Sequence, residues 1–209
     1  MKDIKLRLSP SMFWIVAMMA VILFDSILLQ AETLSPAATH IRSYYQQLMP
    51  TIQQAGQLSV RERDRRFTPA ITSAFDIPTM TRLAVGPAWK RFSADQQAAV
   101  EDAFAKFIIA DYASQVTDYS GESFVVEAQT TPEPRGGGEI VKTKLLQPGG
   151  RTVIINYLVR GGRVIDVYFN GTISDLATRR DEFASIITSG GADGLIKRLR
   201  DRTQSLLGR

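Results

Sequence analysis

Few side chains in this sequence could carry out chemistry. The 209 residues include no cysteine and a single histidine, His40. The lack of cysteine excludes disulfides, thiolate nucleophiles and zinc–thiolate sites. His40 has no metal ligand or catalytic partner near it in the sequence, and its place at the start of a predicted helix favours a surface role over that of a catalytic base. The sequence contains no common nucleophile, zinc-protease or phosphate-loop motif.

Asp166 is the strongest remaining candidate for acid–base chemistry. It lies in a predicted strand, where alternation places it on the same face as Val164 and Tyr168. Ile165, Val167 and Phe169 share the other face of this strand, which we expect to look toward the helices. A pair formed with Tyr157 or Tyr168 is the best general acid–base arrangement that the chain offers. Because no evident acid partner accompanies Asp166, we expect it to have a hydrogen-bonded structural role or to lie at the rim of a pocket.

The N-terminus has the pattern of a secretory signal. Basic residues precede an apolar run over 12–24, and Ala31 offers a cleavage site. We therefore predict export, with a signal peptide over 1–31 and a mature domain over 32–209. An uncleaved membrane anchor stays open as an alternative, because apolar residues continue beyond Asp25.

The hydrophobic period divides the mature chain into three parts. Helical spacing extends over 35–120, where Ser35, Ser59 and Ser93 mark helix starts, and helices return over 174–207 with an interruption at Gly190-Gly191. Between them, over 122–170, the period is two, and short turns rich in glycine and proline require antiparallel neighbours. The predicted strands are 122–130, 139–147, 151–160 and 163–170. This order predicts an α+β domain with helices covering one face of a curved sheet of about four strands.

The net charge of +4 is too small to indicate nucleic-acid binding. A mildly basic surface suits anionic lipid headgroups or acidic partners. The stretch 61–66 is rich in arginine but also contains acidic residues, so a solvated face with local ion pairs is favoured over a docking patch.

An ordered set of landmarks covers nearly the whole mature chain. In the first half they are Phe75-Asp76, Met80, Gly86 to Trp89, Ser93 to Gln97, Phe107, Tyr112 and Tyr119-Ser120-Gly121. In the second half they are Tyr157, Val164 to Val167, Gly171, Ile173-Ser174, Arg179-Arg180, Glu182-Phe183, Gly190 and Leu195-Ile196. The set resembles the MlaC family of periplasmic lipid-carrier proteins. The stretch 171–183 looks more like its HpnM branch, which is associated with hopanoid biosynthesis.

The resemblance implies an NTF2-like curved sheet with a helical subdomain and a deep apolar pocket for lipid tails. It implies a shuttle, not an enzyme, that carries phospholipid or hopanoid between the inner and outer membranes as cargo and uses no cofactor or metal. The implied partners are an inner-membrane ABC transporter complex with an MCE-domain protein and an outer-membrane lipoprotein complex. The alternatives are a membrane-tethered scaffold of a hopanoid-synthesis complex and an enzyme on the same scaffold.

Residues that would line such a pocket come from the apolar surplus of the helices and strands. Periodicity alone predicts core for each of them, since a pocket wall and a core have the same pattern. The candidate lipid-binding residues are Trp89, Phe104, Phe107, Ile108, Tyr112, Ile155, Tyr157, Ile165, Val167, Phe169, Phe183 and Ile187.

Overall fold

The computed structural model describes residues 33–134 and 136–208, so the signal peptide or anchor predicted over 1–31 lies outside the described residues. The helices are α2 (Pro36–Ile52), α3 (Val60–Ala74), α4 (Ile77–Val85), α5 (Ala94–Gln115) and α6 (Asp175–Leu207), with short 3-10 helices η1 (Ala55–Gln57) and η2 (Gly86–Arg91). The strands are β1 (Ser123–Val126), β2 (Thr131–Pro132), β3 (Glu139–Leu146), β4 (Thr152–Arg160), β5 (Arg163–Phe169) and β6 (Ile173–Ser174).

Serine side chains fix the starts of α2, α3 and α5 at the predicted positions. The hydroxyl of Ser35 accepts a hydrogen bond from the backbone N–H of Ala38 at the start of α2, and Ser59 caps α3 in the same way. Ser93 and Gln96 form a reciprocal capping box at the start of α5. These bonds satisfy N–H groups that have no partner inside the helix, which explains why the sequence located the helix starts well.

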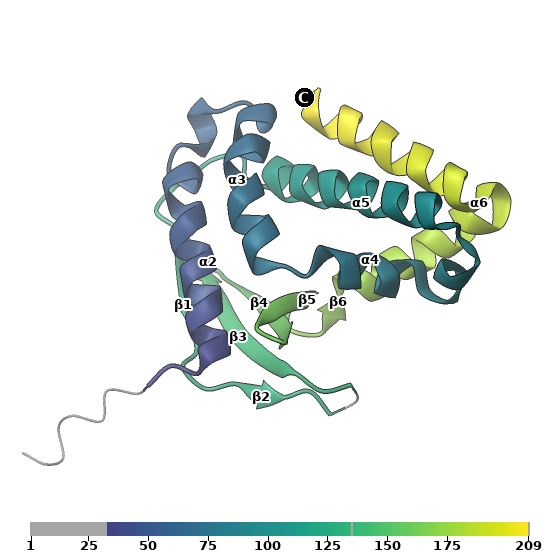
Figure 1. Ribbon diagram of the computed structural model, residues 1–209. Coiled ribbons are helices and arrows are strands. Elements are labelled where there is room, and N and C mark those ends of the chain that lie inside the picture. The colour runs from purple at the N-terminus through teal and green to yellow at the C-terminus, as the bar shows by residue number, and fades with distance from the viewer. Residues whose placement is uncertain (1–32, 135, 209) are drawn as a thin grey trace, which may run out of the picture. The chain divides into compact units, whose positions relative to one another are not determined.

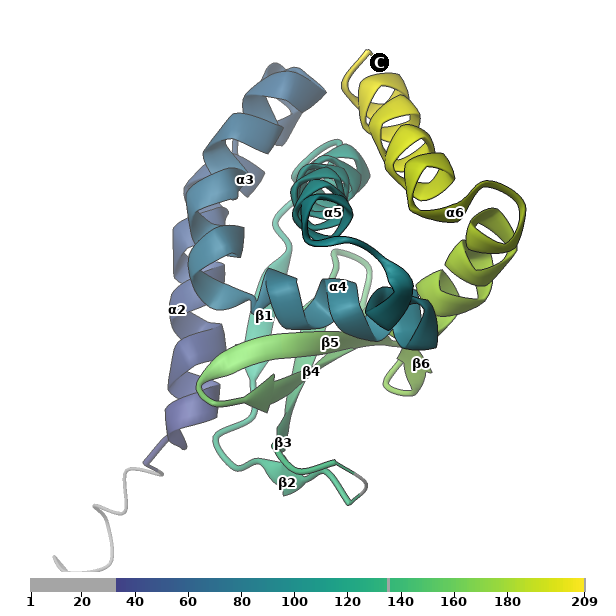
Figure 2. The ribbon, with the colours of Figure 1, turned by 45° about the vertical axis from the view of Figure 1, so that its right-hand side comes forward.

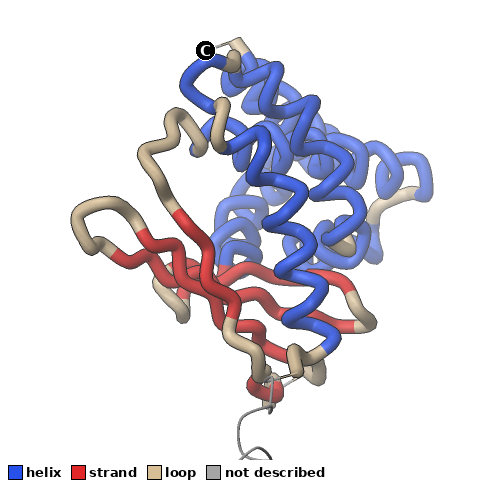
Figure 3. Tube along the Cα trace, turned by 90° about the vertical axis from the view of Figure 1, so that its left-hand side faces the viewer, coloured by secondary structure: helices blue, strands red, loops and turns tan. Residues whose placement is uncertain are grey.

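The sheet is antiparallel throughout, in the order β1-β3-β4-β5-β6, and β2 pairs separately with β3. The helices lie on one side of it (Figures 1 and 3), which confirms the α+β prediction. The strand predicted over 122–130 is shortened to β1, and β2 and β6 are additional strands. Both additions are short, because Pro132 has no N–H to continue a ladder and Ser174 already caps α6.

The helical layer is held together around α5. This helix lies between α3 and α6, and α4 lies closer to the sheet (Figure 2). Helix α6 bends at Gly191, which has the non-helical dihedrals φ 61° and ψ −154° that glycine adopts without strain. The interruption predicted at Gly190-Gly191 is therefore a bend that lets the second half of α6 pack along α5.

Arg63 differs from the solvated arginine face expected over 61–66, because its side chain is buried. Its guanidinium donates hydrogen bonds to the carbonyls of Ala113 (3.0 Å), Ala55 (2.9 Å) and Leu58 (2.6 Å). Ala113 lies in the last turn of α5, where carbonyls lack helical partners and the helix dipole favours a cation. Arg63 thus ties the end of α5 to η1.

The carboxyl end of α3 is held in the same way by two side chains. His40 donates a hydrogen bond from Nε2 to the carbonyl of Ala74 at 3.0 Å, and Arg163 donates to the carbonyls of Thr72 and Phe75 at 2.6 Å. His40 is half-buried, so its contact with a helix end gives it a structural role beyond that of a plain surface residue.

Candidate functional site

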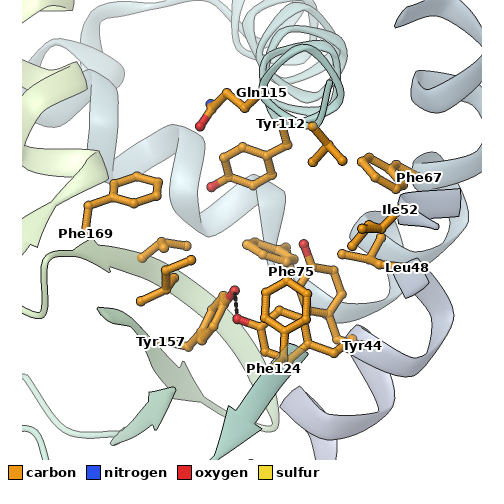
Figure 4. A pocket seen from close by; sticks show the side chains of 14 residues that line it. Tyr44, Leu48, Ile52, Phe67, Phe75, Tyr112, Gln115, Phe124, Tyr157 and Phe169 are labelled. Carbon is orange, nitrogen blue, oxygen red and sulfur yellow. Dashed lines mark hydrogen bonds between the residues drawn. The ribbon is translucent and has the colours of Figure 1, made fainter. Parts of the chain in front are cut away.

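A cavity of about 130 Å³ lies between the helices and the inner face of the sheet (Figure 4). Its walls are almost entirely apolar or aromatic. They are formed by Tyr44, Tyr45, Leu48, Ile52, Phe67, Phe75, Tyr112, Gln115, Val116, Phe124, Ile155, Tyr157, Val167 and Phe169. Gln115, at the end of α5, is the most polar of these lining residues and the one that is exposed, and we infer from this that the cavity opens to solvent beside it.

Strand register explains why β4 and β5 together present four residues to the cavity. Ile155 is opposite Phe169, and Tyr157 is opposite Val167. Residues opposite each other in an antiparallel pair share a face, and alternate residues along a strand do so as well. The sequence predicted that Val167 and Phe169 face the helices, and the register confirms this.

The predicted position of Ile165 on this face is wrong, because its side chain is buried but does not line the cavity. Leu158 is opposite Asp166 while Val159 is opposite Val164, so Ile165 is an extra residue in a β-bulge. A bulge interrupts the alternation of side chains, and nothing in the sequence of β5 marks its position.

Of the twelve candidate residues, five line the cavity: Tyr112, Ile155, Tyr157, Val167 and Phe169. Besides Ile165, six lie elsewhere. Phe104 and Phe183 form an edge-to-face pair, with ring centroids 6.1 Å apart, where α5 packs on α6. Trp89 contacts Phe92 next to η2. Phe107, Ile108 and Ile187 also belong to the helical core.

The candidate residues omitted the whole α2 wall of the cavity, together with Phe67, Phe75, Gln115, Val116 and Phe124. Tyr44, Tyr45, Leu48 and Ile52 all lie in this wall, and Phe75 follows α3. Their helical spacing is evident in the sequence and predicts a buried face. That spacing carries no signal that separates a cavity wall from a solid core.

A chain of hydrogen bonds joins the hydroxyl groups on one side of the cavity. Thr143 donates to the carbonyl of Ile155, so its oxygen accepts from Tyr45 at 3.1 Å. Tyr45 in turn accepts from Tyr157 at 2.7 Å. Burial raises the pKa of Tyr45 to about 12, and it also raises the pKa of Tyr157 above its usual value. The tyrosines are therefore neutral at ordinary pH, and the wall carries no charge.

Asp166 does not lie in this wall. Its carboxylate accepts hydrogen bonds from the Ser174 hydroxyl (2.6 Å) and from the backbone N–H groups of Val167 (2.8 Å) and Leu176 (3.2 Å). Burial raises the pKa of its carboxyl, and these hydrogen bonds oppose that shift. Tyr157 is opposite Val167 and so lies on the other face of the sheet, which excludes the Tyr157–Asp166 pair.

We expect Asp166→Ala to lower the free energy of unfolding by about 1 to 3 kcal/mol, because it removes an acceptor that holds the first turn of α6. Urea titration would measure this loss. The side chain lies on the face of the sheet opposite to the cavity, so the cavity lining should be unchanged. Asp166→Asn is the matched control, because it keeps one acceptor oxygen and should lower the free energy of unfolding by less. An unchanged free energy of unfolding in Asp166→Ala would contradict the structural role.

Within 33–134 and 136–208, no group of three or more histidine, cysteine or acidic side chains is placed to hold a metal ion. In the same ranges no helix is both long enough and apolar enough to span a membrane.

Comparison with known proteins gives a family and a fold. The model of the family described as MlaC protein matches residues 42–201. No curated protein sequence matches the chain significantly. A solved structure, the phospholipid-binding protein from Ralstonia solanacearum in complex with a phospholipid, superimposes with a TM-score of 0.70 at 18% sequence identity, and the match covers 82% of this chain and 99% of that one. Because the family model spans most of the described residues, this chain belongs to the MlaC family.

Proposed function

We propose that this protein is a periplasmic lipid carrier that holds acyl or polycyclic tails in the cavity between α5 and the sheet. The observation that carries the proposal is the uncharged, aromatic and aliphatic lining of a cavity that reaches solvent at Gln115. Membership of the MlaC family and the likeness of the fold to a phospholipid-binding protein support it.

A carrier of this kind works by replacing water around the tail with protein. Each exposed methylene costs about 0.8 kcal/mol, so a chain of about sixteen carbons represents about 13 kcal/mol. That cost makes unaided passage through an aqueous compartment slow. Binding alone removes it, and the site therefore needs no catalytic group.

The cavity has to enlarge to hold a whole tail. An engineered protein cavity of about 150 Å³ takes a molecule the size of benzene, and this one is about 130 Å³. Tyr45 and Phe124 stack with ring centroids 4.0 Å apart, and both also line a larger groove between α2 and β1. Separation of these two rings would join the cavity to the groove and supply the extra length.

Phospholipid is the first cargo to test, because the R. solanacearum protein was solved with a phospholipid. Hopanoid is the second, on the resemblance of 171–183 to the HpnM branch. We further propose exchange with an inner-membrane ABC transporter complex bearing an MCE-domain protein and with an outer-membrane lipoprotein complex. A tethered scaffold remains the alternative if residues 1–31 are retained.

Purified mature protein is expected to carry lipid in a fixed ratio. Native mass spectrometry with lipid extraction, on protein from its own periplasm, would identify the cargo. Adding the same lipid to delipidated protein, at about 100 times the Kd, should stabilise the fold by about 2.7 kcal/mol and raise the thermal midpoint by roughly 5 to 10 °C. An unchanged midpoint, with no copurified lipid, would sink the carrier proposal.

A further inference from the structure

Tyr112 lies in the cavity wall, and its buried hydroxyl is left without a hydrogen-bond partner in the described part of the chain. It extends from α5 toward the sheet, with its ring 6.1 Å from that of Phe75, and its oxygen points into the space above β5 (Figure 4). Tyr45 and Tyr157, across the cavity, satisfy each other. Buried hydroxyl groups are rarely left unpaired, so such a group points to a missing partner.

The surroundings of Tyr112 decide which kind of partner is missing. Burial raises its pKa well above the usual value, and the charge of Asp175 adds to this shift. The hydroxyl therefore keeps its proton and has a hydrogen bond to donate. Apolar Val167 and Phe169 line the cavity with it and cannot accept that bond. The missing partner is therefore a hydrogen-bond acceptor on the molecule that occupies the cavity.

The depth of Tyr112 indicates which part of a lipid would supply that acceptor. Gln115, at the opening, is exposed and follows Tyr112 on α5 by three residues, about one helical turn or about 5 Å, whereas the Tyr112 hydroxyl is buried. In a glycerophospholipid, the ester carbonyls lie between the polar headgroup and the hydrocarbon chains. A headgroup at Gln115 would bring these carbonyls to the level of Tyr112, with the chains running on toward Tyr45 and Phe124.

We propose that the Tyr112 hydroxyl donates a hydrogen bond to an ester carbonyl of the bound lipid, so that the site selects acyl-ester lipids over lipids that are hydrocarbon at this depth. This inference rests on the proposed carrier function and adds a cargo class to it. Tyr112 thereby acts as a specificity residue, because a cargo without the carbonyl would leave its hydroxyl unpaired.

The test compares the affinities of two proteins for two lipids. Wild type and Tyr112→Phe are titrated with a diester phosphatidylglycerol and with its diether analogue of the same chain length, which lacks the carbonyls. We expect Tyr112→Phe to weaken diester binding by about fivefold and to leave diether binding unchanged, as for the loss of one net hydrogen bond. The lipid-free mutant should unfold at a temperature no lower than wild type, since the deleted hydroxyl has no partner there.

Tyr157→Phe is the matched control, because its hydroxyl already has a partner inside the protein. It should lower the thermal midpoint of the lipid-free protein and affect both lipids alike. Equal weakening of both lipids by Tyr112→Phe, or no effect on either, would overturn the assignment of Tyr112 while leaving the carrier function in place. Failure of the wild type to bind either lipid would overturn the carrier function and, with it, this assignment.

Discussion

Val167→Glu is expected to give a folded protein that copurifies without lipid, with lipid affinity reduced more than about tenfold. Val167 is 2% exposed and lies at the centre of the sheet wall of the cavity, opposite Tyr157. A carboxylate there would occupy the space that methylene groups need. In the lipid-free protein the same carboxylate stays hydrated, because water can enter the cavity through the opening at Gln115. Circular dichroism with native mass spectrometry would measure folding and loading separately.

Ile108→Glu is the matched control for this experiment. The sequence suggested Ile108 as a second, weaker position in the pocket wall, but the structure places it in the helical core with no exposure and outside the cavity lining. An unpaired charge buried there should cost several kcal/mol and leave the protein insoluble or molten. The same outcome for Val167→Glu would mean that Val167 belongs to a dry core and that the lipid lies elsewhere.

Arg179→Met is expected to lower the free energy of unfolding by about 3 to 5 kcal/mol. The Arg179 side chain is 9% exposed and donates to Asp175 at 2.9 Å and to Asp111 at 2.8 Å. Its guanidinium also lies 4.9 Å from the centroid of the Phe107 ring. Methionine fills a similar volume but leaves two carboxylates of the α5–α6 contact without a cation, and a buried charge without its partner is costly.

Arg65→Met serves as the control for Arg179→Met. Arg65 also pairs with a carboxylate at 2.8 Å, that of Glu62, but 73% of its side chain is exposed. An exposed pair of this kind contributes about 0 to 1 kcal/mol. Urea denaturation of the two mutants side by side would compare the same substitution in two environments. Equal small losses would show that water reaches the Arg179 cluster and that it does not hold α6 to α5.

Local patterns in the sequence determined the elements of this fold. Ser35, Ser59 and Ser93 marked helix starts because an N-cap is a contact between residues three apart. Alternation placed Val167 and Phe169 on the helix side because the side chains of a strand alternate. The change of period at Gly121 separated the helices from the antiparallel sheet for the same reason. Each of these signals is contained within a few consecutive residues.

Only the tertiary structure decided which apolar side chains surround a cavity. Phe104 and Tyr112 lie on the same helix and have the same kind of spacing, yet Phe104 packs against Phe183 and Tyr112 reaches the cavity. The difference arises from the element that faces each side chain. Helical periodicity indicates that a side chain is buried, but it does not indicate whether another side chain or a cavity lies next to it. The unpaired hydroxyl of Tyr112 and the contact of Arg63 with the end of α5 depend on residues distant in sequence. They therefore become visible only when the chain is folded.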